Sequence, residues 1–173
     1  MLKKFNMNLK KHIDKLEFME VKMEIVDGKE YIEQVRDLII EYIQWLDRDL
    51  SFQEIDDELA DPAKKYTAPE GEILVVIEDS EVLGMVAYHR LSNMRCEMKR
   101  LYVKPKYRGM NLGETLITEI ILHAKKAGYK EMVLDTITPL KSAIYLYQKL
   151  GFKECKPYYH NPMSDVLYFS KKL

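Results

Sequence analysis

The chain has 173 residues, of which 47% are hydrophobic and 32% are charged. A chain of this length can bury the core of one domain, and its composition is typical of a globular protein rather than a disordered one. Its 27 basic and 28 acidic residues leave a net charge of −1. That balance argues against a general nucleic-acid binder, because such proteins need an excess of cations to displace phosphate counterions.

Membrane insertion and secretion are not expected from this sequence. Its apolar stretches fall short of the roughly 20 residues that span a bilayer. Residues 1–20 are rich in lysine but lack the continuous apolar segment and cleavage site of a secretory signal. We therefore expect a cytoplasmic location and no membrane partner.

The two cysteines, Cys96 and Cys155, give no sign of a metal site. Neither belongs to a Cys-x-x-Cys motif, and no histidine stands at ligand spacing from them. Cys96 as a nucleophile is also disfavoured, because no histidine has a visible relation to it. We expect two packed thiols and no bound metal.

The first 20 residues are interpreted as an N-terminal extension to a single domain over residues 21–173. Leu9, Ile13 and Leu16 follow helical spacing, which predicts a short amphipathic helix. Docking on the body of the protein, or fraying, is favoured over a role at a membrane surface.

Hydrophobic periodicity divides the rest of the chain into strands and helices. The expected strands are 21–26, 73–77, 82–91, 96–103, 132–136, 153–157 and 165–170. The expected helices are 29–47, 52–60, 112–127 and 141–150. Asp61-Pro62 ends the second helix, and a loop is expected from there to Gly71. The order β-α-α-β-β-β-α-β-α-β-β predicts an α/β fold whose sheet is mostly antiparallel at first, with a crossover helix in its second half.

The segment Leu101–Leu116 carries a more specific signal. It passes from a strand through the cationic stretch Lys104–Arg108 into a turn with Gly109 and Gly113, and then into a helix. Backbone N–H groups and the positive end of a helix dipole would converge there, which suits a pyrophosphate. The segment matches neither the dinucleotide fingerprint nor a Walker A sequence, so an ordinary strand-to-helix turn is an equal alternative.

Two motifs in the right order carry a family resemblance. Arg108–Gly113, RGMNLG, resembles the Arg/Gln-x-x-Gly-x-Gly/Ala signature of the GNAT N-acetyltransferases. Residues 143–152, AIYLYQKLGF, are similar to the family's second signature, A-x-x-L-Y-x-x-L-G-F. The chain also resembles a bacterial subgroup that carries Asp-Leu-x-Phe-Gln, here at 49–53, and Tyr-Tyr-x-Asn-Pro, here at 158–162.

Two positions depart from the family pattern. Asn111 stands where the family usually has the middle glycine, but asparagine tolerates the left-handed backbone that such a turn needs. Leu140 stands where many members have an asparagine that contacts the cofactor. That contact is expected to be lost or replaced, with Leu140 packing against the pantetheine arm.

The resemblance implies a mixed, mostly antiparallel twisted sheet flanked by helices on both faces. It implies direct transfer of an acetyl group from acetyl-CoA to a primary amine, with no acyl-enzyme and with a small molecule or amino acid as the expected acceptor. Three alternatives stay open: acetylation of a protein N-terminus or lysine, a non-enzymatic acyl-CoA sensor, and a nucleotide-binding regulatory domain. Whether the chain forms a homodimer is also left open.

The resemblance further implies that acetyl-CoA contacts the strand before the turn, the turn itself and the later helix. The residues expected to bind it are Leu101, Tyr102, Val103, Arg108, Gly109, Met110, Asn111, Leu112, Gly113, Glu114, Leu140, Ala143, Leu146 and Tyr147.

Acetyl transfer to an amine needs a base for the amine and an acid for the leaving thiolate. Glu97 occupies the base position of the histone-modifying branch when the signatures are aligned, and strand alternation predicts that it shares a face with Leu101 and Val103. Asp135 is the second candidate, because it matches an acidic residue of the ribosomal-protein branch. Tyr147 is the expected acid; an exposed strand charge for Glu97 and a core aromatic for Tyr147 are the structural alternatives.

Substrate selection is expected from the segment after the first helix and from the tail. Together with Trp45, these segments could form a partly aromatic pocket with one carboxylate, suited to a small cationic amine. The residues expected there are Asp49, Phe52, Gln53, Tyr158, Tyr159 and Asn161. Aromatic side chains that merely hold loops together are an equal alternative.

Overall fold

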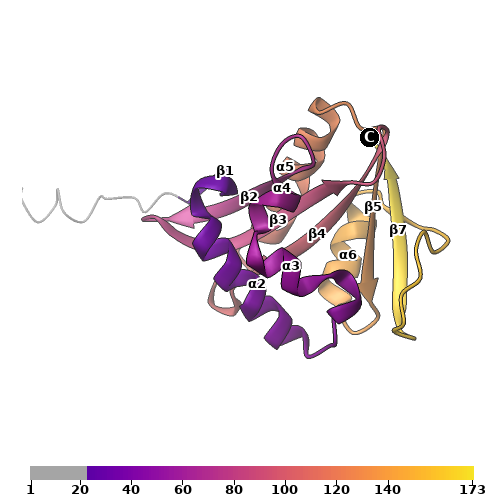
Figure 1. Ribbon diagram of the computed structural model, residues 1–173, viewed down its shortest axis with the longest axis horizontal. Helices are drawn as coiled ribbons and strands as arrows, with labels where there is room; N and C mark the ends of the chain where they lie inside the picture. Colours follow the sequence, from indigo (N-terminus) through magenta and orange to yellow (C-terminus); the bar gives the residue numbers. More distant parts are fainter. Residues whose placement is uncertain (1–22) are drawn as a thin grey trace, which may run out of the picture.

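The computed structural model describes residues 23–173 (Figure 1). The N-terminal extension, its expected helix and the start of the expected strand 21–26 lie outside the described residues. The strands are β1 Glu24–Asp27, β2 Gly71–Glu78, β3 Glu81–Arg90, β4 Arg95–Val103, β5 Glu131–Ile137, β6 Lys153–Glu154 and β7 Val166–Lys172. The α-helices are α2 Ile32–Leu46, α3 Ile55–Ala60, α4 Pro62–Tyr66, α5 Leu112–Lys126 and α6 Lys141–Lys149.

The strands form one seven-stranded sheet in the order β1-β2-β3-β4-β5-β7-β6. Of its neighbouring pairs, β4 and β5 run parallel and the others are antiparallel. A parallel pair needs a long connection from one end of the sheet to the other, and α5 supplies it. The expected mixed, mostly antiparallel sheet with a crossover helix is therefore confirmed.

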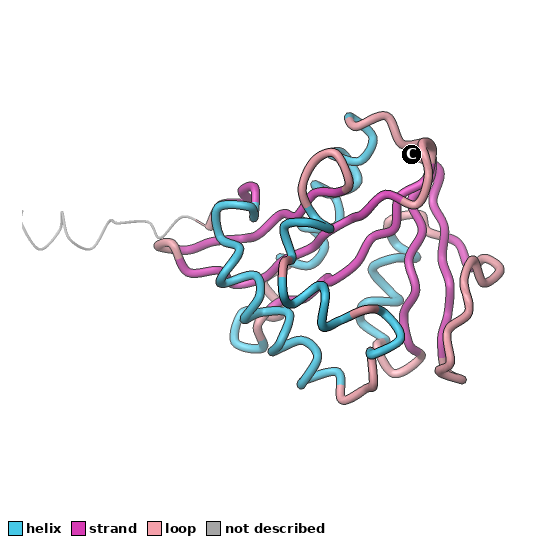
Figure 2. Tube along the Cα trace, in the orientation of Figure 1, coloured by secondary structure: helices cyan, strands magenta, loops and turns pink. Residues whose placement is uncertain are grey.

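Helices cover both faces of the sheet, as Figures 1 and 2 show. On one face, α2 places Val35, Leu38 and Ile39 on a single stripe, and these residues pack with Tyr66 of α4 against β2 and β3. On the other face, α5 and α6 pack against a second apolar cluster that includes Tyr147. Because apolar side chains on each face of the sheet are buried in one of these two cores, the cores fix the direction in which the side chains of each strand point.

The parallel pair β4 and β5 separates soon after it begins. Its paired residues end at Glu97 and Val133, and beyond them the two strands diverge (Figure 1). Beyond these residues, the backbone N–H and C=O groups on the facing edges of β4 and β5 no longer pair with each other. The divergence therefore leaves unpaired backbone groups facing the gap. This gap is where the candidate site lies.

A bulge in β4 reverses the side-chain alternation that we expected. Ala87 pairs with Lys99 and Met85 with Tyr102, so β4 carries one extra residue there, and Arg100 has a left-handed φ of 58°. Glu97 therefore points to the α2 face, whereas Leu101 and Val103 pack on the α5 face. The prediction that Glu97 shares a face with those two residues is wrong, because a non-glycine bulge has no sequence signal.

Two further elements differ from expectation. The stretch expected to be a loop contains α4, because Pro62 fits the first position of a helix and the Asp61 carboxylate accepts from the Lys64 amide at 3.3 Å. Strand β6 has two residues instead of the expected 153–157. Among residues 23–173, no helix combines the length and the hydrophobicity needed to cross a bilayer.

Candidate active site

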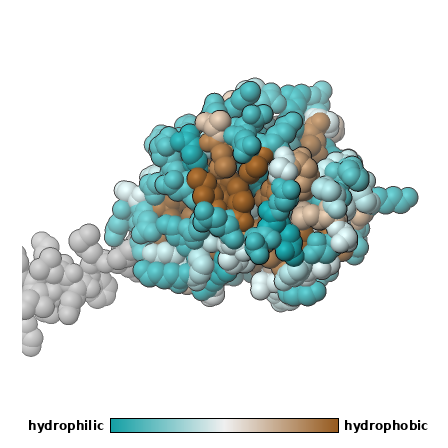
Figure 3. All heavy atoms as spheres, turned by 60° about the horizontal axis from the view of Figure 1, so that its bottom comes forward, coloured by the Kyte–Doolittle hydropathy of each residue, from teal (hydrophilic) through white to brown (hydrophobic). Residues whose placement is uncertain are grey.

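A cavity of about 350 Å³ occupies the gap between β4 and β5. Its walls come from α2, the diverging strands, and the start of α6. Figure 3, in which the bottom of Figure 1 comes forward, shows hydrophobic side chains gathered within a hydrophilic surround on that face. The residues expected to bind acetyl-CoA that line this cavity are Leu101, Tyr102, Val103, Arg108, Gly113, Leu140, Ala143, Leu146 and Tyr147.

The turn before α5 stands beside this cavity. Gly109 and Asn111 both adopt left-handed φ values, 84° and 63°, so Asn111 does take the conformation that the departure from glycine required. The first intrahelical bond runs from the Thr115 amide to the Asn111 carbonyl at 3.1 Å. The preceding amides of the helix have no partner within it, as at any helix N-terminus, and they can receive an anion.

The remaining turn residues border the cavity less directly. Met110 is 51% exposed, and the Glu114 carboxylate pairs with Lys149 at 2.6 Å. Neither side chain lines the cavity, and the same holds for Gly109, Asn111 and Leu112. Any contribution of these five residues to a bound pyrophosphate would come from their backbone amides.

Arg108 forms one wall of the cavity together with Trp45. Its guanidinium carbon lies 4.4 Å from the Trp45 ring centroid and 5.4 Å from that of Tyr102. Its Nε donates to the carbonyl of Val103 at 3.0 Å. The guanidinium thus spans the end of β4 and the α2 aromatic residues, where a cation stacked on rings is favourable.

Tyr147 is both a core residue and a wall of the cavity. It is 6% exposed, and its ring contacts Phe152 and Phe169 with centroids 6.0 and 6.2 Å apart. Burial raises the pKa of the Tyr147 phenol well above its usual value, so the hydroxyl stays protonated at neutral pH. The core role and a proton-donor role are therefore compatible at this position.

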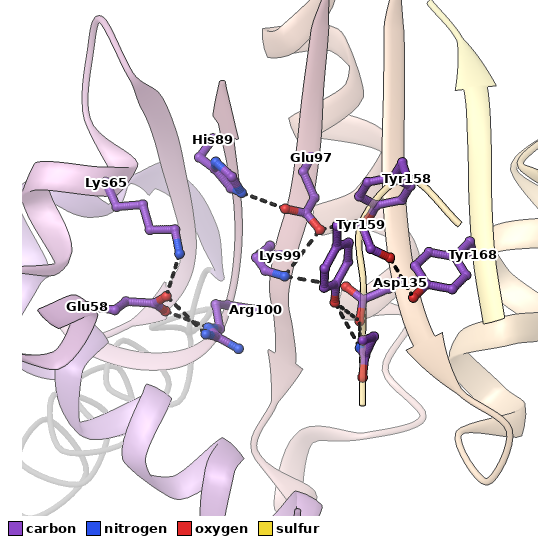
Figure 4. A network of polar contacts seen from close by, with 11 residues as sticks. Glu58, Lys65, His89, Glu97, Lys99, Arg100, Asp135, Tyr158, Tyr159 and Tyr168 are labelled. Carbon is purple, nitrogen blue, oxygen red and sulfur yellow. Dashed lines mark hydrogen bonds and ion pairs between the residues drawn. The ribbon is translucent and has the colours of Figure 1, made fainter. Parts of the chain in front are cut away.

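A polar network joins the diverging strands (Figure 4). The Lys99 ammonium lies 3.2 Å from Glu97 Oε1 and 3.4 Å from Asp135 Oδ1. Tyr158 donates to Glu97 Oε1 at 2.7 Å, and Tyr159 donates to Asp135 Oδ2 at 3.0 Å. The two candidate bases thus share one lysine, and each holds a tyrosine of the tail.

Two more groups complete this network. Asn161 Nδ2 lies 3.3 Å from Asp135 Oδ2 and 2.9 Å from the Tyr159 hydroxyl. His89 Nε2, on the neighbouring strand β3, lies 2.6 Å from Glu97 Oε2. The tail motif at 158–162 is therefore tied to the sheet carboxylates.

The Glu97 carboxylate and the Lys99 ammonium are both held in their charged forms. Burial opposes a charge on Glu97, but the hydrogen bond from His89 and the positive charge of Lys99 outweigh it and lower the pKa of the carboxyl to about 2. Burial likewise opposes the charge on Lys99, yet Asp135 and Glu97 raise the pKa of its ammonium. Burial and then the charges of Glu97 and Asp135 raise the pKa of Tyr158.

A second cavity, of about 470 Å³, lies on the other side of this network. It is lined by Phe52, Gln53, Glu54, Lys65, His89, Leu91, Ser92, Arg95, Glu97, Lys99, Tyr158 and Tyr159. Gln53 and Lys99 also line the first cavity, so the two spaces share these side chains as a common wall. The Gln53 Oε1 is buried and has no hydrogen-bond partner among the described residues, so it remains available to a ligand.

Two of the expected substrate residues, Asp49 and Asn161, lie outside both cavities. Asp49 is exposed, and its carboxylate accepts from the Ser51 amide at 2.9 Å, where it caps the turn that follows α2. It borders neither cavity. Capping a turn is an ordinary use of an aspartate, and it accounts for Asp49 of the motif at 49–53.

Several residues of the site were not singled out from the sequence. Arg100 donates to both oxygens of Glu58 at 2.5 and 3.0 Å, and Lys65 reaches the same carboxylate at 3.1 Å. These residues come from separate parts of the chain, so no local spacing joins them.

Burial raises the pKa of the Cys96 thiol to about 12, which agrees with the expected packed thiol.

Known proteins resemble this chain both in sequence and in fold. Residues 33–152 match the family model described as acetyltransferase (GNAT) family. An uncharacterized N-acetyltransferase of Schizosaccharomyces pombe is 49% identical over 133 residues, which cover 76% of this chain and 82% of that protein. An acetyltransferase structure from Streptococcus agalactiae has a TM-score of 0.73 at 27% identity, over 87% of this chain and 98% of that chain.

A further structure shares the fold at lower identity. A Salmonella typhimurium protein, solved with its cofactor acetyl-CoA, has a TM-score of 0.70 at 19% identity, over 87% of this chain and 94% of that chain.

Proposed function

The chain belongs to the GNAT acetyltransferase family, and from that premise we propose that it transfers an acetyl group directly from acetyl-CoA to a primary amine of a small molecule. One observation carries this proposal. The first cavity, between β4 and β5, and the second cavity, which Glu97 lines, meet at Gln53 and Lys99. A donor and an acceptor could therefore approach one another from opposite sides.

The donor is assigned to the first cavity. When bound, acetyl-CoA supplies an activated acetyl thioester. The edge of β4 at Leu101–Val103 that faces β5 has no strand partner there, and it would hold the pantetheine arm. The amides of the turn before α5 would hold the pyrophosphate. The apolar side chains of Leu140 and Leu146 would exclude water from the thioester.

The acceptor amine is assigned to the second cavity, whose volume suits a small molecule. Glu97 has about four lone-pair positions, and His89, Lys99 and Tyr158 occupy three of them. The position left on Oε2 can hold an ammonium group. With a pKa of about 2, Glu97 is a poor proton acceptor, so we assign it to binding the amine.

Asp135 is assigned as the proton acceptor. It lines the first cavity, where the thioester would lie, whereas Glu97 lines only the second. In this proposal the bound ammonium first loses one proton to solvent and becomes a free amine. The amine nitrogen attacks the acetyl carbon and loses a second proton to Asp135 as the C–N bond forms, and the C–S bond of the thioester breaks. Tyr147 gives its hydroxyl proton to the departing thiolate, and the proton on Asp135 returns to the Tyr147 oxygen through solvent.

Trp45 provides the test of the donor site. It is the only tryptophan in the chain, and it lines the first cavity. Titration with acetyl-CoA should change its fluorescence saturably, and ATP should not. Trp45→Phe should remove the signal while calorimetry still detects binding. Absence of acetyl-CoA binding by both methods would overturn the proposal.

A further inference from the structure

The charged side chains around the second cavity are unevenly balanced from one wall to the other. Arg95 pairs one-to-one with Glu131 at 2.6 Å, so that pair is neutral. Glu54 is exposed at the rim, where solvent screens its charge. The remaining charges fall into two groups on opposite sides, seen to the left and right of Figure 4.

The group on the α4 side carries a surplus positive charge. The buried Glu58 carboxylate already makes two hydrogen bonds to the buried Arg100 guanidinium, at 2.5 and 3.0 Å. That pair is complete by itself. Lys65 adds a second cation to the same carboxylate, and its side chain remains 27% exposed and lines the cavity.

The group on the β4 and β5 side carries a surplus negative charge. Glu97 and Asp135 are two carboxylates that share the single ammonium of Lys99. His89 contacts Glu97 and would add a positive charge only if protonated. The floor of the cavity therefore favours a cation, while the wall at Lys65 favours an anion.

We propose that the acceptor is a small amine that also carries a carboxylate, bound with its amine toward Glu97 and its carboxylate on Lys65. The inference rests on the proposed acetyl transfer, because it names the acceptor for that reaction. Two opposite charges on one small molecule would balance both groups at once, whereas a plain amine would leave the surplus positive charge of Lys65, Arg100 and Glu58 uncompensated.

Matched acceptors test the proposal with the full chain and saturating acetyl-CoA. Each series contains an amino acid, its amide and its decarboxylated amine: alanine, alaninamide and ethylamine; phenylalanine, phenylalaninamide and phenethylamine. Values of kcat/KM are corrected for the fraction of unprotonated amine, because the amide is a weaker base than the acid. In at least one series, the acid should exceed both partners by about tenfold or more, the usual scale for a charged hydrogen bond.

Variants of α4 separate charge at the site from charge in general. Lys65→Gln should lower kcat/KM for the preferred acid about tenfold and leave its decarboxylated partner within about twofold. Lys65→Arg should restore most of the loss. The matched control is Lys64→Gln, which removes an exposed charge from the neighbouring position of the same helix and should change nothing.

The outcomes separate this inference from the proposed function. If amines are acetylated but amides or decarboxylated amines equal the acids throughout, the carboxylate site is overturned and acetyl transfer stands. Equal losses on all acceptors in Lys65→Gln would overturn it in the same way. If acetyl-CoA binds and no acceptor in any series is acetylated, acetyl transfer to small amines and this inference fail together.

Discussion

The ammonium of Lys99 lies 3.4 Å from the carboxylate of Asp135, and this ion pair bridges β4 and β5 just beyond their last paired residues, Glu97 and Val133. Side chains thus take over where backbone pairing stops. The bridge holds the two strands at a set separation, and it places both carboxylates of the site around one buried charge. The cavities on either side of it depend on that arrangement.

The roles of the two carboxylates make a ranked prediction. Asp135→Asn should lower kcat by roughly 10²–10⁴, the general range for acid–base catalysis, because it removes the proposed proton acceptor. Glu97→Gln should chiefly raise KM for the amine, because its pKa of about 2 suits it to binding. Steady-state kinetics of both variants measures these effects, with their thermal stabilities compared as a control. A larger loss of kcat in Glu97→Gln than in Asp135→Asn would reverse the two assignments.

The pH–rate profile gives an independent prediction. A carboxyl with a pKa of about 2 stays ionised throughout the range of a usual assay. An acidic limb between pH 6 and 8 must therefore report another group, and its midpoint should be unchanged in Glu97→Gln. A limb that disappears in that variant would mean that Glu97 titrates with substrate bound, contrary to its assignment.

Tyr147→Phe should lower turnover much more than it weakens acetyl-CoA binding. The ring contacts with Phe152 and Phe169 survive the substitution, and only the hydroxyl is lost. A decrease in kcat of roughly 10²-fold or more is expected if the phenol protonates the thiolate. Calorimetry with acetyl-CoA serves as the control, and an unchanged rate with a chemistry-limited acceptor would leave Tyr147 a core residue.

Gly113 offers a graded test of the donor cavity. A Cβ built there would meet Leu146 Cδ1 at 3.5 Å, which is ordinary contact, so Gly113→Ala should fold and retain affinity. Gly113→Val places further methyl groups in a position that lines the cavity and should weaken acetyl-CoA binding strongly. Unchanged affinity in a folded Gly113→Val protein would contradict the assigned position of the cofactor.

The Glu58–Arg100 pair should contribute to the acid stability of the fold. Burial opposes the charge on Glu58, but Arg100 lowers its pKa from the usual 4.5 to about 2. Its contribution is therefore complete above pH 4.5 and is lost as the pH falls toward 2. Glu58→Leu should lower the free energy of unfolding at pH 7 by about 3–5 kcal/mol, because it leaves Arg100 buried without a partner.

The double variant Glu58→Leu/Arg100→Met is the control for that prediction. It removes the unpaired charge along with the pair, so it should be more stable than Glu58→Leu alone. Urea denaturation measures both. A double variant that loses as much as the two single variants added together would show that packing, rather than charge, holds this part of the sheet.

Local patterns in the sequence predicted most of the elements. Helix α5 was expected at 112–127 and spans Leu112–Lys126, and β4 was expected at 96–103 and spans Arg95–Val103. Both follow from apolar periodicity and from glycine or proline at their ends. The family signatures also led to residues that line the first cavity, because the residues of each signature lie close together along the chain.

Four of the expected substrate residues, Phe52, Gln53, Tyr158 and Tyr159, line the second cavity, but the polar pairings around it could not be predicted in the same way. The paired residues lie far apart along the chain: Arg100 and Glu58 are separated by 42 positions, and Tyr158 and Glu97 by 61. The bulge at Arg100 then turned Glu97 to the opposite face from the one expected. Such pairings arise from the sheet order and from one backbone distortion, neither of which leaves a local pattern.

The central claim is that the chain acetylates a small amine at the junction of the two cavities. The most direct measurement is amine-dependent release of free CoA from acetyl-CoA by the full chain, with the acetylated amine identified by mass spectrometry. We predict CoA release that rises with amine concentration, saturates, and matches the acetylated product in amount. CoA release that is the same with and without amine, or no acetylated product while acetyl-CoA is bound, would contradict it.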